Sequence, residues 1–265
     1  MYNTAPIRDL VPHAWSLEGF LFPATYKFPR HPKAQDVANA MVQKFKEHWA
    51  RIAAGADAPD VNSVATLASL VERETPQPDE RPLVAGVFEN RLSRRIALQC
   101  DPTVIYALER TGQYKGALSS ADLHVDSPYN TYRYRGLPPG PIGNPGEASL
   151  QAALAPAETD YLYFVANAHG GHFFAETLAE HNRNVARYRR LMAGRASLYG
   201  TVLRARPVEE KAAAVQAFAR SVVPLLGAGR TLPTVDHVFP AAQAAAAFDY
   251  LARPGKFGKI LLEFA

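Results

Sequence analysis

The sequence predicts an α+β protein in which helices dominate and strands come late. Apolar residues recur at helical spacing in successive segments between residues 34 and 156. Runs rich in aromatic and β-branched residues, typical of strands, follow only after residue 160. With 265 residues, 48% of them hydrophobic and 20% charged, the chain is large enough to bury a core in one large domain or two small ones.

The N-terminal part is expected to be extended before the first helix begins. Prolines recur from Pro12 to Pro32, and proline disfavours helix interiors. Residues 34–54 then predict a helix. Its apolar face would carry Val37, Met41, Phe45, His48 and Ile52.

Three further helices are predicted before the middle of the chain. Asn62 or Ser63 is expected to cap the first of them, and Pro76 to stop it. Its buried stripe would consist of Val64, Leu67, Ala68 and Val71. The other two are expected over residues 80–94 and 102–112.

An irregular tract, SPYNTYRYRGLPPGPIGNPGEAS, occupies residues 127–149. A loop of this length inside a compact domain is usually functional or disordered. Tyr129, Tyr132 and Tyr134 argue against disorder.

After the tract, the sequence predicts a helix, a hairpin and a second helix. The first helix covers residues 149–156, and strands are expected over 161–167 and from His172, joined at a Gly-Gly turn. The second helix covers residues 178–192.

The composition changes near residue 191, where Ala becomes dominant. The remaining segments alternate as helix, strand, helix and strand, which predicts a small αβαβ tail as a separate unit. The expected domains are residues 1–33 (remnant of an N-terminal region and linker), 34–192 (catalytic domain) and 193–265 (tail).

The overall charge excludes few functions. The formal net charge is +4, and Lys and Arg are scattered, which argues against nucleic acid binding. Cys100 is the sole cysteine, so an internal disulfide is excluded. No signal peptide and no apolar run of about 18 residues is visible, so we expect no anchor or export signal of its own.

Two carboxylates, Glu72 and Glu74, stand at the end of a predicted helix in the segment LASLVERETP. At about 100° per residue, each lies roughly 70–90° from the centre of the apolar stripe, on opposite sides. They are a poor pair for two-carboxylate chemistry, which needs side chains across a shared cleft. A half-buried Glu has a raised pKa and can act alone as a general acid. The alternative is a structural glutamate paired with Arg73 or Arg81.

Residues from about 16 to 188 resemble the YceG-like (MltG) family of endolytic murein transglycosylases. The matching blocks occur in family order: SLEGFLFPATYKF, LASLVERET, ERPLVAGVFENRL, LQCDPTVIYAL, SPYNTYRYRGLPPGPIGNPG, ASLQAALAPAETDYLYFVAN and GGHFFAETLAEHN. The resemblance implies a YceG-like catalytic fold and a lytic transglycosylase, a lyase. It also implies that Glu72 is the catalytic acid. Glu72 would cleave the β-1,4 bond between N-acetylmuramic acid and N-acetylglucosamine, then act as base while the muramic C6 oxygen closes a 1,6-anhydro ring.

The same resemblance implies the other site residues. Substrate-binding roles fall on Glu18, Glu74, Gln99, Asp101, Asn130, Thr131, Tyr132, His172 and His181. For Glu18 the alternative is a buried structural carboxylate. Cys100 stands where members of the family usually carry Ser or Thr.

The histidines raise the question of a metal site. His169, His172 and His181 form an HxxH pattern with a distant third His, but across a Gly-Gly turn and without the usual zinc motifs. We therefore expect hydrogen bonding rather than metal binding, and no cofactor.

The tail contains the blocks SLYGTVLRARPVEEKAAAV, VPLLGAGRTLPTVDHVFP and AAAAFDYLARPGKFGKILLEF. On these blocks, residues from about 197 to 264 resemble the C-terminal end of zinc-independent medium-chain quinone oxidoreductases, which suggests a fusion of two truncated genes. No strand followed by GxGxxG is present, and GAGR at 227–230 ends a helix, so the tail alone is not expected to bind NADPH.

The leading hypothesis is thus a peptidoglycan lytic transglycosylase of the cell envelope. By family resemblance it would act at the outer face of the inner membrane and contact the cell-wall synthesis machinery. Without an anchor or export signal of its own, the chain could instead be cytoplasmic. The alternatives are an inactive peptidoglycan-binding remnant and an NADPH:quinone oxidoreductase fragment.

Overall fold

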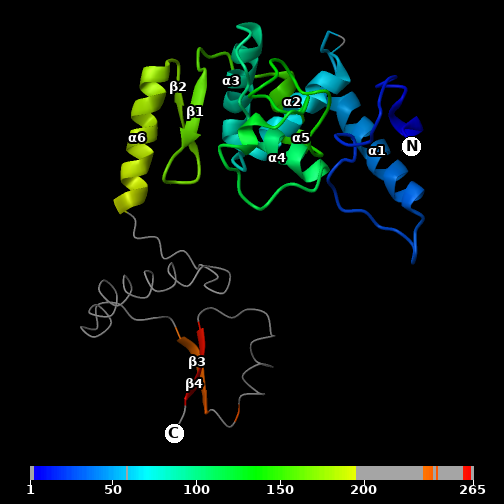
Figure 1. Ribbon diagram of the computed structural model, residues 1–265. Coiled ribbons are helices and arrows are strands. Elements are labelled where there is room, and N and C mark those ends of the chain that lie inside the picture. Colours follow the sequence, from blue (N-terminus) through cyan, green and yellow to red (C-terminus); the bar gives the residue numbers. More distant parts are fainter. Residues whose placement is uncertain (1–2, 58, 195–234, 241–242, 244–258, 264–265) are drawn as a thin grey trace. The chain divides into compact units, whose positions relative to one another are not determined.

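The computed structural model describes residues 3–57, 59–194, 235–240, 243 and 259–263 (Figure 1). The chain divides into two compact units, residues 1–197 and 198–265. Helices dominate the described part of the first unit, which also carries a two-stranded antiparallel sheet. The predicted α+β class is therefore confirmed.

The helices follow the predicted order closely. They are η1 (Ala5–Ile7), α1 (Ala34–Ile52), α2 (Val61–Glu74), η2 (Pro78–Glu80), α3 (Arg81–Ser93), α4 (Asp101–Arg110), η3 (Asp122–His124), α5 (Glu147–Leu154) and α6 (Leu178–Gly194). The strands β1 (Tyr163–Ala166) and β2 (His172–Ala175) pair antiparallel, with Tyr163 opposite Ala175. This pair is the predicted hairpin.

Helix α2 lies at the centre of the first unit and contacts α3, α4 and α5 (Figure 1). The sequence predicted a one-sided apolar stripe, but every residue from Ala65 to Val71 is buried. The small side chains of Ala65, Ala68 and Ser69 are the reason, because they let neighbouring helices approach α2 on several sides.

The cap of α2 differs from the prediction. Asp60 is the N-cap, and its carboxylate accepts hydrogen bonds from the backbone N–H groups of Asn62 and Ser63. The predicted caps are thus the donors of the motif. At the other end, Thr75 is extended, as expected for a residue before proline, so the helix ends at Glu74.

The hairpin and α6 cover one flank of the central helices, and α1 with the N-terminal segment covers another (Figure 1). Phe88 of α3 meets Phe164 of β1 edge-to-face, with ring centroids 6.0 Å apart. On the α1 side, Phe45 packs edge-to-face on Phe20 at 5.3 Å. Phe20, Phe45 and Phe88 are buried and Phe164 is partly buried, so these contacts fix the hairpin and α1 against the core.

The irregular tract after residue 127 is held by polar contacts rather than by regular structure. Asn130 is fully buried, and its side-chain amide donates to the carbonyls of Leu123 and Val125. Farther along, Ile142 N–H donates to Ser69 Oγ of α2, at 3.0 Å. These hydrogen bonds make the tract an ordered part of the domain.

In the second unit, β3 (Val235–Pro240) and β4 (Lys259–Glu263) form a parallel pair. The sequence predicted both strands. The two helices predicted between residues 206 and 255 lie outside the described residues. Within the described ranges, no helix combines the length and the apolar content needed to cross a bilayer.

Candidate active site

A cavity of about 330 Å³ lies where the central helices, the hairpin and α6 meet. It takes side chains from α2, α3, α4, β1, α6 and the irregular tract. Its lining consists of Glu74, Phe88, Arg91, Leu98, Gln99, Asp101, Tyr132, Tyr163, Phe164, Leu178 and His181. Aromatic faces alternate with polar groups, which is the lining expected of a site for sugar rings.

Glu74, the last residue of α2, brings an acid into this cavity. Burial raises the pKa of its carboxyl group, and the neighbouring negative charge of Asp101 raises it further. Hydrogen bonding from the Cys100 thiol and the proximity of His172 act in the opposite direction. The net pKa is above the usual range, so Glu74 holds a proton at higher pH than an ordinary glutamate.

Glu72 has a different environment. One carboxylate oxygen accepts from Arg81 Nη2 at 3.2 Å, and the other accepts from Gly146 N–H at 3.1 Å and Ser149 Oγ at 2.8 Å. Gly146 is the N-cap of α5, so the carboxylate lies at the positive end of that helix. Glu72 therefore ties α2 to α5, and the predicted alternative of a pair with Arg81 is confirmed.

The two glutamates contact separate groups, as the helical angles predicted. Glu72 faces α5, whereas Glu74 faces the cavity. They do not form an acid/base pair with each other. Glu74, predicted for substrate binding, lies in the cavity with a raised pKa. Glu72, predicted as the acid, is hydrogen-bonded to Arg81, Gly146 and Ser149.

Gln99 forms part of the cavity in a strained backbone conformation. Its φ is 53°, in the left-handed region that non-glycine residues rarely adopt. The backbone is pinned because Gln99 N–H donates to Thr131 O at 3.2 Å and Cys100 N–H donates to Thr131 Oγ1 at 3.0 Å. The side chain is held as well, since its Oε1 accepts from Arg91 Nη1 at 3.2 Å. Strain maintained by surrounding contacts is typical of functional sites.

Asp101 and Tyr132 form a second polar pair in the cavity. The Tyr132 hydroxyl donates to Asp101 Oδ1 at 2.5 Å. Burial and this hydrogen bond raise the pKa of Tyr132, so the hydroxyl stays protonated and remains a donor. Asp101 begins α4, where the helix dipole stabilises a negative charge.

His172 and His181 flank the cavity in different ways. The carboxylate of Glu80 accepts a hydrogen bond from the backbone N–H of His172 at 2.8 Å and contacts the ring Nδ1 of the same residue at 2.7 Å. These contacts hold the hairpin against η2. His181 lines the cavity and stacks on Tyr163, with ring centroids 5.2 Å apart. Burial, then the charge of Arg91, lowers the pKa of His181, which favours a neutral ring. Among the described residues, no group of three or more His, Cys, Asp or Glu is placed to hold a metal ion.

The structure brings five of the predicted site residues together in one cavity and places the others elsewhere. Those that share the cavity are Glu74, Gln99, Asp101, Tyr132 and His181. Asn130 and Thr131 are buried and hold the tract through hydrogen bonds, and neither lines the cavity. His172 is occupied by Glu80.

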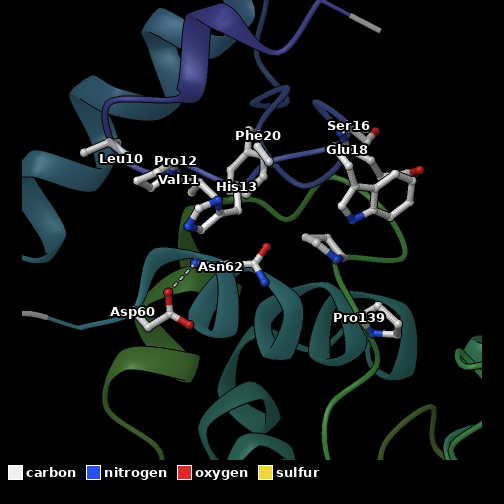
Figure 2. Close-up of a pocket in the computed structure, with 13 residues that line it drawn as sticks. Leu10, Val11, Pro12, His13, Ser16, Glu18, Phe20, Asp60, Asn62 and Pro139 are labelled. Atoms are coloured by element: carbon white, nitrogen blue, oxygen red, sulfur yellow. Dashed lines mark hydrogen bonds between the residues drawn. The ribbon is translucent and has the colours of Figure 1, made fainter. Parts of the chain in front are cut away.

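Glu18 is apart from the others. It lines a different cavity of about 340 Å³, between the N-terminal segment and the start of α2 (Figure 2). Figure 2 shows Leu10 and His13 on one side of this cavity and Asn62 on the other. The Glu18 carboxylate accepts from the Tyr106 hydroxyl at 2.7 Å. Glu18 does not line the cavity that contains Glu74.

Sequence reasoning missed three contributors. Arg91 is 7% exposed and donates to the carbonyls of Ala97, Leu98 and Leu162. The available signal was the spacing of Arg91, which follows Val87 by four residues and Phe88 by three. This spacing places a charged side chain on the same helix face as two buried apolar ones. Tyr163 supplies an aromatic wall, and its position carries no signal of its own. The Cys100 thiol lies beside Glu74, and the signal there was a cysteine where the family usually carries Ser or Thr.

The YceG-like family profile matches residues 3–187. The chain belongs to the YceG-like family. A protein named endolytic murein transglycosylase from Bacillus subtilis (strain 168) is 42% identical over 175 residues, which are 65% of this chain and 48% of that relative. A protein of the same name from Streptococcus pneumoniae (serotype 2, strain D39) is 33% identical over 193 residues, 71% of this chain and 35% of the relative. The YceG-like chain therefore spans about half or less of these relatives.

A solved structure supports the same assignment. The crystal structure of a YceG-like protein from Listeria monocytogenes aligns with a TM-score of 0.58 and 43% identity, covering 63% of this chain and 55% of that one. A second profile, described as zinc-binding dehydrogenase, matches residues 150–262 and overlaps the first match over residues 150–187. This second match supports the predicted joining of two unlike sequences in this YceG-like chain.

Proposed function

We propose that this chain cleaves glycan strands of peptidoglycan as an endolytic lytic transglycosylase, with Glu74 as the catalytic residue. The single observation that carries the proposal is a carboxyl group of raised pKa in a cavity lined by aromatic rings. The names of the relatives point to the same substrate class. Glu72, which the sequence favoured, is assigned instead to positioning α5 against α2.

The reaction needs one carboxyl group that works twice. Protonated Glu74 gives its proton to the glycosidic oxygen as the bond to the muramic C1 breaks. The resulting carboxylate then takes the proton from the C6 hydroxyl of the same sugar, whose oxygen bonds to C1. No water is consumed, and Glu74 ends protonated. Because the nucleophile belongs to the substrate, the attack gains from proximity.

The other cavity residues would hold the sugars around Glu74. Tyr132 and Tyr163 offer ring faces and hydroxyl groups, and the Gln99 amide offers both a donor and an acceptor. Neutral His181 adds a nitrogen that can bond to a hydroxyl or an N-acetyl group. The two carboxyls, Glu74 and Asp101, have separate tasks, since Asp101 is engaged by Tyr132.

Product analysis by mass spectrometry tests the proposal directly. Purified protein incubated with peptidoglycan is expected to release chains that end in 1,6-anhydro-muramic acid, and none of the product oxygen should come from ¹⁸O-labelled water. Reducing ends that contain ¹⁸O would overturn the transglycosylase reaction and indicate a hydrolase in which Asp101 activates water. Binding to sacculi without any cleavage would indicate a peptidoglycan-binding module. A rise in Tm on addition of NADPH would support the oxidoreductase alternative.

The pH profile of the reaction is expected to depend on Cys100. Burial and the neighbouring Glu74 raise the pKa of the thiol well above its usual value, so it stays a hydrogen-bond donor. This bond lowers the pKa of Glu74. In Cys100→Ala the pKa of Glu74 should rise, and the alkaline limb of kcat/KM should move to higher pH. Cys100→Ser keeps a donor and should leave the limb near that of the wild type. An alkaline limb that moves to lower pH in Cys100→Ala would contradict the contact.

The place of action follows from the substrate. We propose that the protein works in the cell envelope, where peptidoglycan lies, and that it acts beside the cell-wall synthesis machinery at the outer face of the inner membrane. The relatives' names support the envelope role. Crosslinking in cells followed by identification of attached proteins tests the partners.

A further inference from the structure

A third cavity, of about 740 Å³, takes residues from the end of α4 opposite Asp101. Its lining includes Trp15, Glu18, Gln35, Tyr106 and Arg110. Trp15, Ser16 and Glu18 also line the neighbouring cavity shown in Figure 2, so this short N-terminal stretch separates two hollows of the surface.

Trp15 is an exposed aromatic residue held in place by a cation. Trp15 is 48% exposed, whereas the other tryptophan, Trp49, is buried. The Arg110 guanidinium lies over three rings, 4.9 Å from the centroid of Trp15, 5.4 Å from that of Tyr129 and 5.8 Å from that of Tyr106. Cation–π contact with Arg110 thus holds the exposed Trp15 ring in the lining of this cavity.

Polar groups surround the ring at the edge of the cavity. The Tyr106 hydroxyl donates to the Glu18 carboxylate at 2.7 Å, which fixes an acceptor near Trp15. Gln35 of α1 adds an amide to the lining. An aromatic face flanked by fixed carboxylate and amide groups suits a pyranose ring, whose C–H face is apolar and whose hydroxyls lie around its edge.

Helix α4 and the irregular tract connect this cavity to the catalytic one. Asp101 at the start of α4 lines the cavity of Glu74, and Arg110 at its end lines the cavity of Trp15. Nine residue steps span about 14 Å along a helix axis. Within the tract, Tyr132 faces the catalytic cavity, while Tyr129 packs under Arg110. One rigid element therefore carries both sites.

We propose that the Trp15 cavity binds a remote stretch of the same glycan strand, with Trp15 stacking on a sugar ring. This inference rests on the proposed function, because it takes the glycan strand as substrate. An enzyme that cuts within a polymer gains affinity from rings beyond the broken bond, and a second site on a rigid helix supplies it without reshaping the catalytic cavity.

Binding and kinetics together test the proposal. Trp15→Ala is expected to weaken cosedimentation with peptide-free glycan strands about tenfold, as expected for the loss of one stacked aromatic anchor. It should raise KM for long strands and leave kcat/KM for a tetrasaccharide unchanged. Trp15→Phe keeps a ring and should restore most of the binding. Phe28→Ala removes another exposed aromatic residue, which lines none of these cavities, and is the matched control.

The outcomes separate this inference from the proposed function. Equal glycan binding by Trp15→Ala and the wild type, at equal Tm, overturns the second site even if anhydro ends are released. Glycan binding that depends on Trp15 in a protein that releases no product overturns the proposed reaction and supports the second site. A parallel loss of binding to long strands and of tetrasaccharide turnover would place Trp15 in the catalytic site and overturn the remote role.

Discussion

Glu74→Gln is expected to reduce release of anhydro ends by about 10³-fold, within the range by which a general acid–base group accelerates reactions. The amide keeps the shape of the side chain but cannot give or take the proton. The folded protein should be at least as stable as the wild type at neutral pH. Burial raises the pKa of Glu74 in the folded chain, so the folded state binds its proton more tightly than the unfolded state. Stability therefore falls as pH rises from the ordinary range to the raised pKa, and Gln removes that loss.

Glu72→Gln is the matched control, two positions earlier on the same helix. It removes the charge that pairs with Arg81 but leaves an oxygen that can accept from Ser149. We expect a lower Tm and activity within about tenfold of the wild type, because charge-assisted contacts contribute on the order of 1–3 kcal/mol. If Glu72→Gln abolishes product release and Glu74→Gln does not, the assignment made from the sequence is correct and the one made from the cavity is wrong.

Local pattern was sufficient for most of the fold. The helix of Phe45, the hairpin after residue 160 and the irregular tract all follow from spacing, strand composition and proline content. The error at the cap of α2 has a local cause, since Asp60, Asn62 and Ser63 are all good caps and only the start of the helix decides among them. The all-round burial of α2 depends on tertiary contacts that periodicity does not encode.

The site was predictable in kind but not in detail. The helical angles showed that Glu72 and Glu74 point apart, yet they could not show which side holds the cavity. That depends on where α4 and α5 pack on α2 and where the hairpin packs on α3, which are contacts between segments distant in sequence. The family resemblance pointed to segments that line the cavity, but it could not separate Tyr132, which faces the cavity, from Asn130, which holds the loop.

Arg91 shows how one buried cation supports both fold and site. Its guanidinium donates to Leu162 O at 2.6 Å, Ala97 O at 3.0 Å and Leu98 O at 2.9 Å. It thereby joins α3 to the start of β1 and to the segment that precedes Gln99. Burial lowers the pKa of the guanidinium, which reflects the cost of keeping this charge out of water. The hydrogen bonds to the three carbonyls offset that cost, and they require the planar guanidinium group.

Arg91→Met is therefore expected to lower the free energy of unfolding by about 3 kcal/mol, because it leaves buried carbonyls without their donor. For a domain of this size the Tm should fall by roughly 10 °C. Activity should fall as well, since the Gln99 amide loses its partner. Arg91→Lys should not restore the Tm, because an ammonium group cannot reproduce the planar set of N–H donors that a guanidinium offers. Arg94→Met, at the end of the same helix, removes an Arg whose partner Asp160 is exposed, and should leave the Tm unchanged. Equal melting curves for Arg91→Met and Arg94→Met would show that the carbonyls find other donors, and that Arg91 does not hold the wall of the cavity.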